Sequence, residues 1–99
     1  MLKGSYINIL SNKTRTVSYI EVTSNLESPV HDHKNGNGSQ FTRRYKCHDL
    51  VYYKFYDHIM SAIEREKVLK RWNRKWKEQF ILAFNPKLED LWNDIQGFN

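Results

Sequence analysis

Three segments of the chain have the alternation of apolar and polar residues that predicts β-strands. The first, Ser5–Leu10, ends at the polar residues 11–13, which are typical of a turn. The second, Thr16–Val22, is rich in β-branched and aromatic residues, which favour strands. The short polar link between these two segments predicts an antiparallel hairpin. Asp49–Phe55 is expected to form a third strand.

Between the second and third predicted strands, the sequence favours one helix and a loop. Residues 23–25 are Thr, Ser and Asn, which can cap a helix that runs to about His33. A second interpretation starts this helix at Pro29 with Ser28 as its cap, because proline favours the first helical position. Residues 34–39 are rich in Asn and Gly, which predicts a loop. Phe41–Tyr45 follows the loop as a basic and aromatic patch.

The C-terminal half has helical spacing of its apolar residues. Helices are expected from about Asp57 to Trp72 and from about Asn73 to Ala83, where the following Asn-Pro pair ends the second one. A last short helix is marked by Leu88, Leu91, Trp92 and Ile95. The predicted order is β-β-α-β-α-α-α. This order indicates a mixed α+β fold in which helices flank a three-stranded antiparallel sheet, with residues 1–99 as one domain.

Composition points to a basic protein inside the cell. Lys and Arg number 16 and Asp and Glu number 11, so the formal net charge is +5. This balance is typical of proteins with a polyanionic partner, nucleic acid first and an anionic membrane surface second. The one cysteine, Cys47, cannot form an internal disulfide, which favours a reducing compartment. No apolar run is long enough to span a membrane and Met1–Gly4 lacks the apolar stretch of a signal peptide, so we expect a cytoplasmic protein.

Glu66 is the acidic residue whose position is hardest to explain by solubility alone. It lies three residues after Ile63 and three before Leu69, on the apolar stripe of the predicted Asp57–Trp72 helix. A carboxylate on the core side of a helix is costly unless it is paired, protonated or bound to a metal. Two interpretations stay open at this point, a metal ligand or a residue at the edge of the stripe that pairs with a Lys or Arg.

Other residues gave weaker indications of a site. His31 and His33 do not share a face of a helix, so we do not expect them to share a metal ion. Cys47 has no arrangement of partners that indicates nucleophilic catalysis. The basic residues best placed to contact phosphates are Arg43, Arg44 and Lys46, and on the Glu66 helix Lys70. The alternative interpretation of these cations is a solvated surface.

Several short motifs in the expected order resemble the GIY-YIG endonuclease superfamily. The similarity is strongest to its small stand-alone branch, which is related to the N-terminal nuclease domain of the excinuclease C subunit. The segments that carry the resemblance are Tyr6–Leu10, Tyr19–Leu26, His33–Lys34, Phe41–Tyr45, Leu50–Tyr53, Arg65–Trp72, Asn85–Pro86 and Asp90–Leu91. They cover nearly the whole chain.

This resemblance implies a metal-dependent phosphodiesterase that acts on DNA. In the family a single glutamate holds one Mg²⁺ or Mn²⁺, and Glu66 takes that position here. Tyr19 corresponds to the tyrosine that helps activate or bind the attacking water. His33 corresponds to a supporting histidine, and Asn85 to a late asparagine that orients the site. The resemblance does not specify an oligomeric state.

Three positions depart from the family pattern where function is expected. The tyrosine of the first half-motif corresponds to Asn8, the glycine of the second to Glu21, and the arginine that clamps the phosphate to Pro29. Proline can neither donate a hydrogen bond nor carry charge. Glu21 adds negative charge, which would either repel DNA or supply a second metal ligand. Tyr6 shares a strand face with Asn8 and partly replaces the missing tyrosine, displaced by about 7 Å along the strand.

These departures favour an endonuclease with impaired activity. Two alternatives stay open. One is a relative that binds nucleic acid without cleaving it, and the other is a protein-interaction remnant in which the basic charge confers only solubility. Arg43 or Arg44 could also reach the site from the loop and replace the lost clamp.

Overall fold

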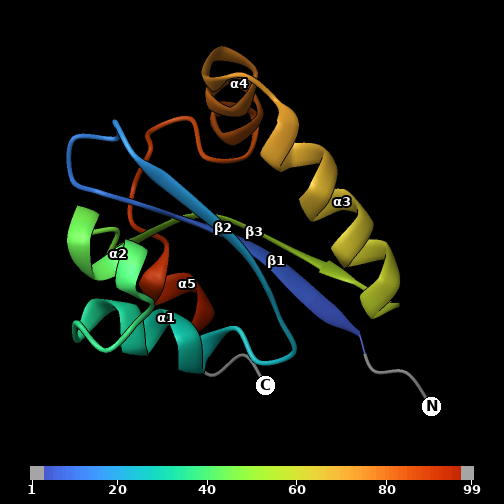
Figure 1. The fold of residues 1–99 in the computed structure, drawn as a ribbon, viewed down its shortest axis with the longest axis horizontal. Coiled ribbons are helices and arrows are strands. Elements are labelled where there is room, and N and C mark those ends of the chain that lie inside the picture. Colours follow the sequence, from blue (N-terminus) through green and yellow to red (C-terminus); the bar gives the residue numbers. More distant parts are fainter. Residues whose placement is uncertain (1–3, 97–99) are drawn as a thin grey trace.

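The computed structural model describes residues 4–96, which form one sheet with helices on both faces (Figure 1). The strands are β1 (Ser5–Ser11), β2 (Ser18–Thr23) and β3 (Asp49–Tyr56). The helices are α1 (Glu27–Lys34), α2 (Gln40–Tyr45), α3 (Ile59–Arg71), α4 (Arg74–Phe84) and α5 (Trp92–Ile95). The predicted α+β fold class is confirmed, and the predicted order of strands and helices agrees with the structure apart from one additional helix, α2.

β1 is the central strand of the sheet. The strand order is β2-β1-β3, and both neighbouring pairs are antiparallel, as predicted. Asn8 lies opposite Glu21 on one side and opposite Tyr53 on the other. β2 pairs only with β1 within the described residues, so it forms an edge of the sheet.

The alternation of side chains along β1 separates two hydrophobic cores. Ile7 and Ile9 pack with Ile20 of β2 and with Ala62 and Leu69 of α3. Leu10 packs on the opposite face, in a cluster completed by Leu26, Val30, Cys47, Leu50 and Ile95. α3 and α4 therefore cover one face of the sheet, while α1, α2 and α5 lie on the other, as Figure 1 shows. We call these the α3 face and the α1 face.

The loop of the β1–β2 hairpin is longer than predicted, because it includes Thr16 and Val17. The side-chain oxygen of Asn12 accepts hydrogen bonds from the backbone N–H groups of both residues, at 2.9 and 3.1 Å. Arg15 has a φ angle of 59°, in the left-handed region. β2 therefore begins at Ser18 rather than at Thr16.

The first helix agrees with the first of the two predicted starts within about two residues, and not with a start at Pro29. α1 begins at Glu27, with Leu26 as its N-cap residue, and the side chain of Asn25 accepts from the Ser28 N–H at 3.2 Å. Pro29 therefore lies inside the first turn rather than at its first position. It is tolerated there because the first N–H groups of a helix have no partner within the helix.

Two other segments differ from expectation. Residues 40–45 form the short helix α2, for which Ser39 supplies the N-cap by accepting from the Thr42 N–H at 3.2 Å. The last helix contains only Trp92–Ile95, because Leu88 has a φ angle of 49° and cannot be helical. Among residues 4–96, no helix combines the length and apolar character needed to cross a membrane.

Candidate active site

Asn8 and Glu21, two of the residues that depart from the family pattern, are hydrogen-bonded to each other. The register of β1 and β2 places them directly opposite, and Asn8 Nδ2 donates to Glu21 Oε1 at 3.3 Å. Asn8 is fully buried. Its Oδ1 is buried without a hydrogen-bond partner among the described residues. The amide is therefore held through its nitrogen by the Glu21 carboxylate.

His33 joins this pair from α1. Its Nε2 lies 3.1 Å from Glu21 Oε1, and its Nδ1 lies 2.8 Å from Thr42 Oγ1 of α2. The histidine is buried. When Nε2 carries the proton it donates to the carboxylate, and Nδ1 then accepts from the Thr42 hydroxyl. Both ring nitrogens of His33 are thus used in contacts within the protein.

Gly38 allows the loop between α1 and α2 to pass directly over the His33 ring. A Cβ atom at this position would lie 1.9 Å from Nδ1 of His33 and 2.7 Å from Oγ1 of Thr42. Such distances are far below van der Waals contact. Any side chain at position 38 would therefore displace the ring or the loop, so a glycine is required by close approach.

Tyr19 lies on the same face of β2 as Glu21, two residues away. Its ring centroid is 5.9 Å from that of His33, in an edge-on arrangement, and 5.6 Å from that of Phe41, in a stacked one. The tyrosine is partly exposed. The structure therefore brings Tyr19 and His33 together, as the sequence resemblance implied.

Tyr6 lies apart from Tyr19. It faces Thr23 across the ladder, whereas Tyr19 faces Leu10, so four residues of β1 separate the two positions, about 13 Å. The Tyr6 ring packs edge-on against Phe55, with centroids 5.2 Å apart. This separation speaks against Tyr6 as a direct substitute for the missing tyrosine.

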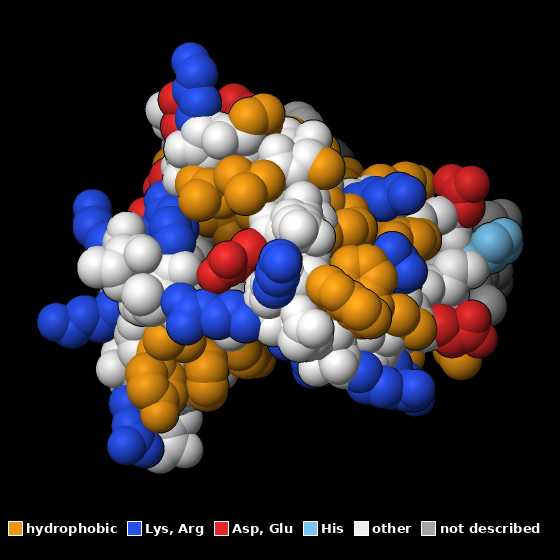
Figure 2. All heavy atoms as spheres, turned by 90° about the horizontal axis from the view of Figure 1, so that it is seen from above, with side chains coloured by type: hydrophobic (Ala, Val, Ile, Leu, Met, Phe, Trp, Pro, Cys, Tyr) orange, Lys and Arg blue, Asp and Glu red, His pale blue; other side chains and the backbone are white. Residues whose placement is uncertain are grey.

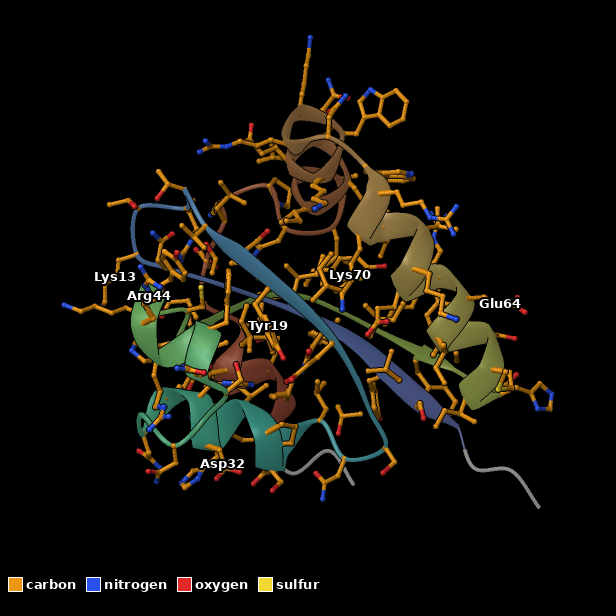
Figure 3. The ribbon with its side chains drawn as sticks, viewed as in Figure 1. Lys13, Tyr19, Asp32, Arg44, Glu64 and Lys70 are labelled. Atoms are coloured by element: carbon orange, nitrogen blue, oxygen red, sulfur yellow. The ribbon has the colours of Figure 1, made fainter. Side chains whose placement is uncertain are left out.

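Glu66 projects from α3, the helix on the opposite face of the sheet. Its side chain is 20% exposed, and its Oε2 lies 3.7 Å from Nζ of Lys70. This is the one ion pair of Glu66 within residues 4–96. Figure 3 shows Glu64 of the same helix pointing away from the sheet, and Glu64 is exposed where Glu66 is only partly exposed. Both interpretations of Glu66 agree with this geometry, since the carboxylate is partly accessible and its partner is an exposed lysine.

The donor set suits a hard cation held by one carboxylate. Among residues 4–96, no three His, Cys, Asp or Glu side chains come together as ligands. Glu21 is engaged by Asn8 and His33, which disfavours it as a second ligand. A single oxygen donor with open positions fits Mg²⁺ or Mn²⁺, which retain water in their coordination shells.

Asn85 connects the end of α4 to the sheet. Its Nδ2 donates to the backbone oxygens of Val51 at 3.2 Å and Glu89 at 2.8 Å, and its Oδ1 accepts from the Glu89 N–H at 3.2 Å. The side chain is buried. All these contacts stabilise the chain reversal after α4, so Asn85 acts on the site through the fold.

Among residues 4–96, the first turn of α1 contains no Arg or Lys. Arg43 and Arg44 are exposed on α2, and Lys46 is exposed in the left-handed conformation just after it. The guanidinium carbon of Arg44 lies 5.4 Å from the ring centroid of Tyr45, a cation–π contact. These cations, with Lys70 on α3, are accessible to a phosphate backbone.

Cys47 is a core residue. It is fully buried, and burial raises the pKa of its thiol above the ordinary value, an effect opposed by a hydrogen bond from the Asn12 backbone. A raised pKa keeps the thiol protonated at neutral pH. The cysteine is therefore unsuited to nucleophilic catalysis.

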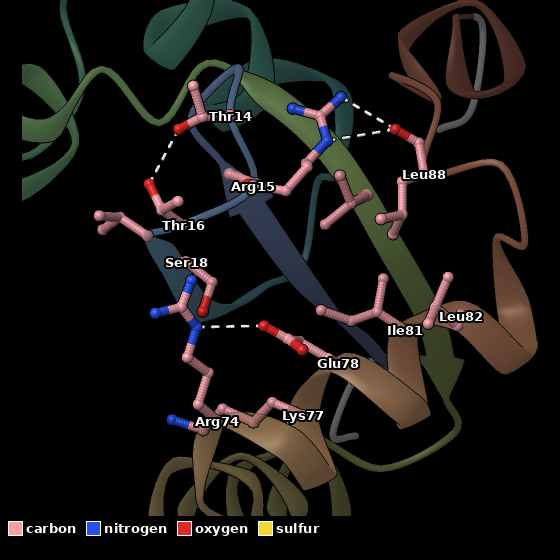
Figure 4. Close-up of a pocket in the computed structure, with 13 residues that line it drawn as sticks. Thr14, Arg15, Thr16, Ser18, Arg74, Lys77, Glu78, Ile81, Leu82 and Leu88 are labelled. Carbon is pink, nitrogen blue, oxygen red and sulfur yellow. Dashed lines mark hydrogen bonds and ion pairs between the residues drawn. The ribbon is translucent and has the colours of Figure 1, made fainter.

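A pocket of about 470 Å³ lies away from this site, between the hairpin loop and α4 (Figure 4). Arg15, a partly buried cation of its lining, is bound to Asp49 at 2.8 Å and to the Leu88 carbonyl at 3.0 and 3.1 Å. On its rim Arg74 pairs with Glu78 at 3.1 Å. Figure 4 shows Arg15 directed at the Leu88 carbonyl and Arg74 directed at Glu78. Arg15 therefore connects the hairpin loop to the loop that follows α4.

Sequence reasoning missed the roles of Thr42 and Gly38. Thr42 is buried and bridges His33 to α2, while Gly38 makes room for the His33 ring. Nothing in their local sequence indicates these contacts. The Asn8–Glu21 pair, by contrast, follows from the hairpin register, because the two residues are partners across β1 and β2.

Comparison with known proteins supports the resemblance. The family model of the GIY-YIG catalytic domain matches residues 4–79. A UPF0213 protein of Clostridium perfringens is 33% identical over 91 residues, which cover 92% of this chain and 97% of that protein. A UPF0213 protein of Natronomonas pharaonis is 31% identical over 81 residues, covering 82% of this chain and 94% of that protein. A third, from Bacillus cereus, is 29% identical over 68 residues, covering 69% and 71%. No solved structure matches significantly.

Proposed function

This chain belongs to the GIY-YIG family, and on that premise we propose that it is a DNA-binding phosphodiesterase of reduced hydrolytic activity. Family membership relates it to nucleases and implies interaction with nucleic acid in general. DNA as the substrate, dependence on a divalent metal, and the reduction in activity are our proposals.

Glu66 would hold one Mg²⁺ or Mn²⁺. Its carboxylate is partly exposed, and its lysine partner lies at 3.7 Å on the solvent side of α3. When bound, the metal supplies positive charge that stabilises the charge developing on the phosphate. Glu66 itself positions that charge, while Lys70 beside it is free to turn towards a phosphate of the substrate.

Tyr19 would hold the attacking water through its hydroxyl group. It is partly exposed on β2, which is an edge strand. Glu66 lies on the α3 face and Tyr19 on the α1 face, and the two faces meet at the free edge of β2. We therefore infer that the scissile phosphate lies along this edge, with Arg43, Arg44 and Lys46 contacting phosphates on the α1 side.

We infer reduced activity from the hydrogen bond between Glu21 and His33. His33 uses both ring nitrogens within the protein, so it offers the substrate neither a proton nor a charge. Glu21 adds a carboxylate where the family has glycine, and Pro29 removes the phosphate clamp. Losing such a donor in phosphoryl transfer costs roughly 3–4 kcal/mol in the barrier, a factor of hundreds in rate.

The test is nicking of supercoiled plasmid DNA in Mg²⁺ and in Mn²⁺. We expect slow nicking that chelation with EDTA abolishes and that Glu66→Gln removes. Glu64→Gln is the matched control, since it changes the same charge on the same helix and should leave nicking unchanged. Nicking that persists in Glu66→Gln would refute the assignment of the metal to Glu66.

The triple variant Asn8→Tyr, Glu21→Gly, Pro29→Arg restores the family pattern at all three departures. Asn8 and Glu21 are changed together because they bond to each other, and Glu21 also bonds to His33. Nicking should rise by about a hundredfold or more. A folded triple variant without any rise would contradict the inferred cause of the reduced activity. If the natural chain binds DNA but never cleaves it, the non-catalytic alternative is correct.

A further inference from the structure

Three aromatic rings lead from the candidate site to the surface of α2. Tyr19 stacks on Phe41 with centroids 5.6 Å apart, and Phe41 contacts Tyr45 with centroids 4.7 Å apart. Phe41 and Tyr45 are four residues apart in the same helix, so they share one of its faces. The three residues form a continuous row, which we call the aromatic row.

The outer part of the row is exposed. Phe41 and Tyr45 are 40% and 41% exposed, whereas Tyr19 at the inner end is only partly so. The residue of α2 that anchors the helix is Thr42, which is buried and bound to His33. Packing of the protein's own core therefore does not require Phe41 and Tyr45 to be aromatic.

Cations flank these rings along the chain, and Arg44 lies over the Tyr45 ring. Arg43 and Arg44 lie between them in sequence, Lys46 follows, and all three are exposed. Figure 2 shows hydrophobic side chains bordered by Lys and Arg at the end of the molecule where α2 and the hairpin lie, and Figure 3 places Arg44 and Lys13 at that end. No acidic residue lies within α2 or between it and β3 until Asp49.

We propose that the aromatic row is a stacking platform for unpaired bases, so that this protein prefers nucleic acid with a single-stranded segment next to the cleaved bond. This inference rests on the proposed function, because it specifies the form of nucleic acid that reaches Tyr19. Exposed rings beside a positively charged surface bind single strands in a sequence-tolerant way, since every base has a face that can stack. In a paired duplex the base faces are covered by their neighbours and cannot stack on Phe41 or Tyr45.

The charge pattern favours nucleic acid over a protein partner on this surface. Arg43, Arg44 and Lys46 form no ion pair within residues 4–96. An apolar protein contact would have to desolvate these three cations and would gain little from them. A strand of nucleic acid uses both features at once, because its phosphates alternate with its bases. The phosphates would lie on Arg43, Arg44 and Lys46 while one or two bases lie on the rings.

The experiment measures binding by fluorescence anisotropy in EDTA, which prevents cleavage. The probes are three labelled oligonucleotides of about 12 nucleotides, within the range of single-strand site sizes. They are oligothymidylate, an abasic strand of equal length, and a duplex. The variants are Phe41→Leu and Tyr45→Leu, and Phe84→Leu is the matched control because Phe84 is 46% exposed on α4. Thermal unfolding confirms that each variant is folded.

We expect oligothymidylate to bind at least about fivefold more tightly than the abasic strand, and each ring substitution to remove most of that difference. Duplex affinity and the Phe84→Leu variant should change less than about twofold. Equal binding of all three probes, or ring variants that bind oligothymidylate normally, would refute the stacking platform while leaving the proposed phosphodiesterase activity untouched.

If no probe binds even at low salt, both proposals fail. A ring variant that changes the oligomeric state but not the affinity would show a protein contact instead, and would also overturn the platform.

Discussion

Oε1 of Glu21 lies 3.1 Å from Nε2 of His33 and 3.3 Å from Nδ2 of Asn8, so one carboxylate oxygen joins β1, β2 and α1. Two of the three departures from the family pattern are therefore halves of one hydrogen-bonded pair. Where the family has a tyrosine and a glycine, this chain has a buried amide and the carboxylate that satisfies it. The two changes compensate each other structurally, and Glu21 also occupies Nε2 of His33.

Glu21→Ala should lower the free energy of unfolding by about 1–3 kcal/mol, because the buried amide of Asn8 and the buried ring of His33 both lose a partner. Urea denaturation monitored by tryptophan fluorescence measures this change. Glu64→Ala, on the exposed face of α3, should change stability by less than about 0.5 kcal/mol. Equal effects of the two substitutions would mean that the Glu21 network contributes nothing to stability.

Gly38→Ala should destabilise the protein by about 1–3 kcal/mol, because the new methyl group would overlap Nδ1 of His33 at 1.9 Å. Its control is Gly36→Asn, since a Cβ at Gly36 meets no atom within 4 Å and Asn tolerates the left-handed φ of 76°. The ring protons of His33 in an NMR spectrum should shift in Gly38→Ala alone. Unchanged His33 signals would contradict the close approach.

The fold could be predicted because its signals are local. Alternation marked the three strands, and helical spacing marked α3 and α4 within two residues at each end. The misplaced boundaries all involve side chains that bond to the backbone. Asn12 holds Thr16 and Val17 in the hairpin loop, and Asn85 holds the reversal that makes Leu88 non-helical. α2 was missed because six residues give too short a pattern to indicate a helix.

The candidate site was predictable only in part, because its residues come from different elements. Family resemblance located Tyr19 and His33, which the structure brings together. It did not indicate that Glu21 binds His33, since that contact depends on how α1 lies over the edge of β2. It also did not indicate that Tyr6 lies far from Tyr19 along the sheet. Strand alternation predicts the face on which a residue lies, but not the residue opposite it on the neighbouring strand.

Asn85→Ala should act on stability rather than on chemistry. The substitution leaves the carbonyl of buried Val51 and that of Glu89 without their shared donor, which costs about 1–3 kcal/mol. At a temperature where the variant is fully folded, its nicking rate should equal that of the natural chain. A large loss of nicking in the folded variant would indicate that Asn85 touches the substrate.

Stability should fall at alkaline pH through Tyr52. Burial, aided by the neighbouring Tyr56 and opposed by Arg65, raises the pKa of Tyr52 from 10.0 to about 12. Because the pKa is higher in the folded state, this contribution is fully present below pH 10 and is lost as the pH rises from 10 to 12. Between pH 10 and 12, the free energy of unfolding should fall less steeply with pH for Tyr52→Phe than for the natural chain. Tyr45→Phe, which alters an exposed ring, should leave the slope unchanged.

Lys70→Gln should increase the affinity of the protein for Mn²⁺, because the Lys70 ammonium group competes with the metal for the Glu66 carboxylate at 3.7 Å. An exposed ion pair contributes about 0.2–1 kcal/mol, so the dissociation constant should fall by a factor of about 1.4–5. Calorimetric titration of Mn²⁺ without nucleic acid measures this effect apart from any contact of Lys70 with phosphate. Lys67→Gln is the matched control, since it removes the same charge from the exposed surface of α3 and should change the affinity less. Equal changes in both variants would assign the effect to net charge, and metal binding that survives Glu66→Gln would place the ion elsewhere.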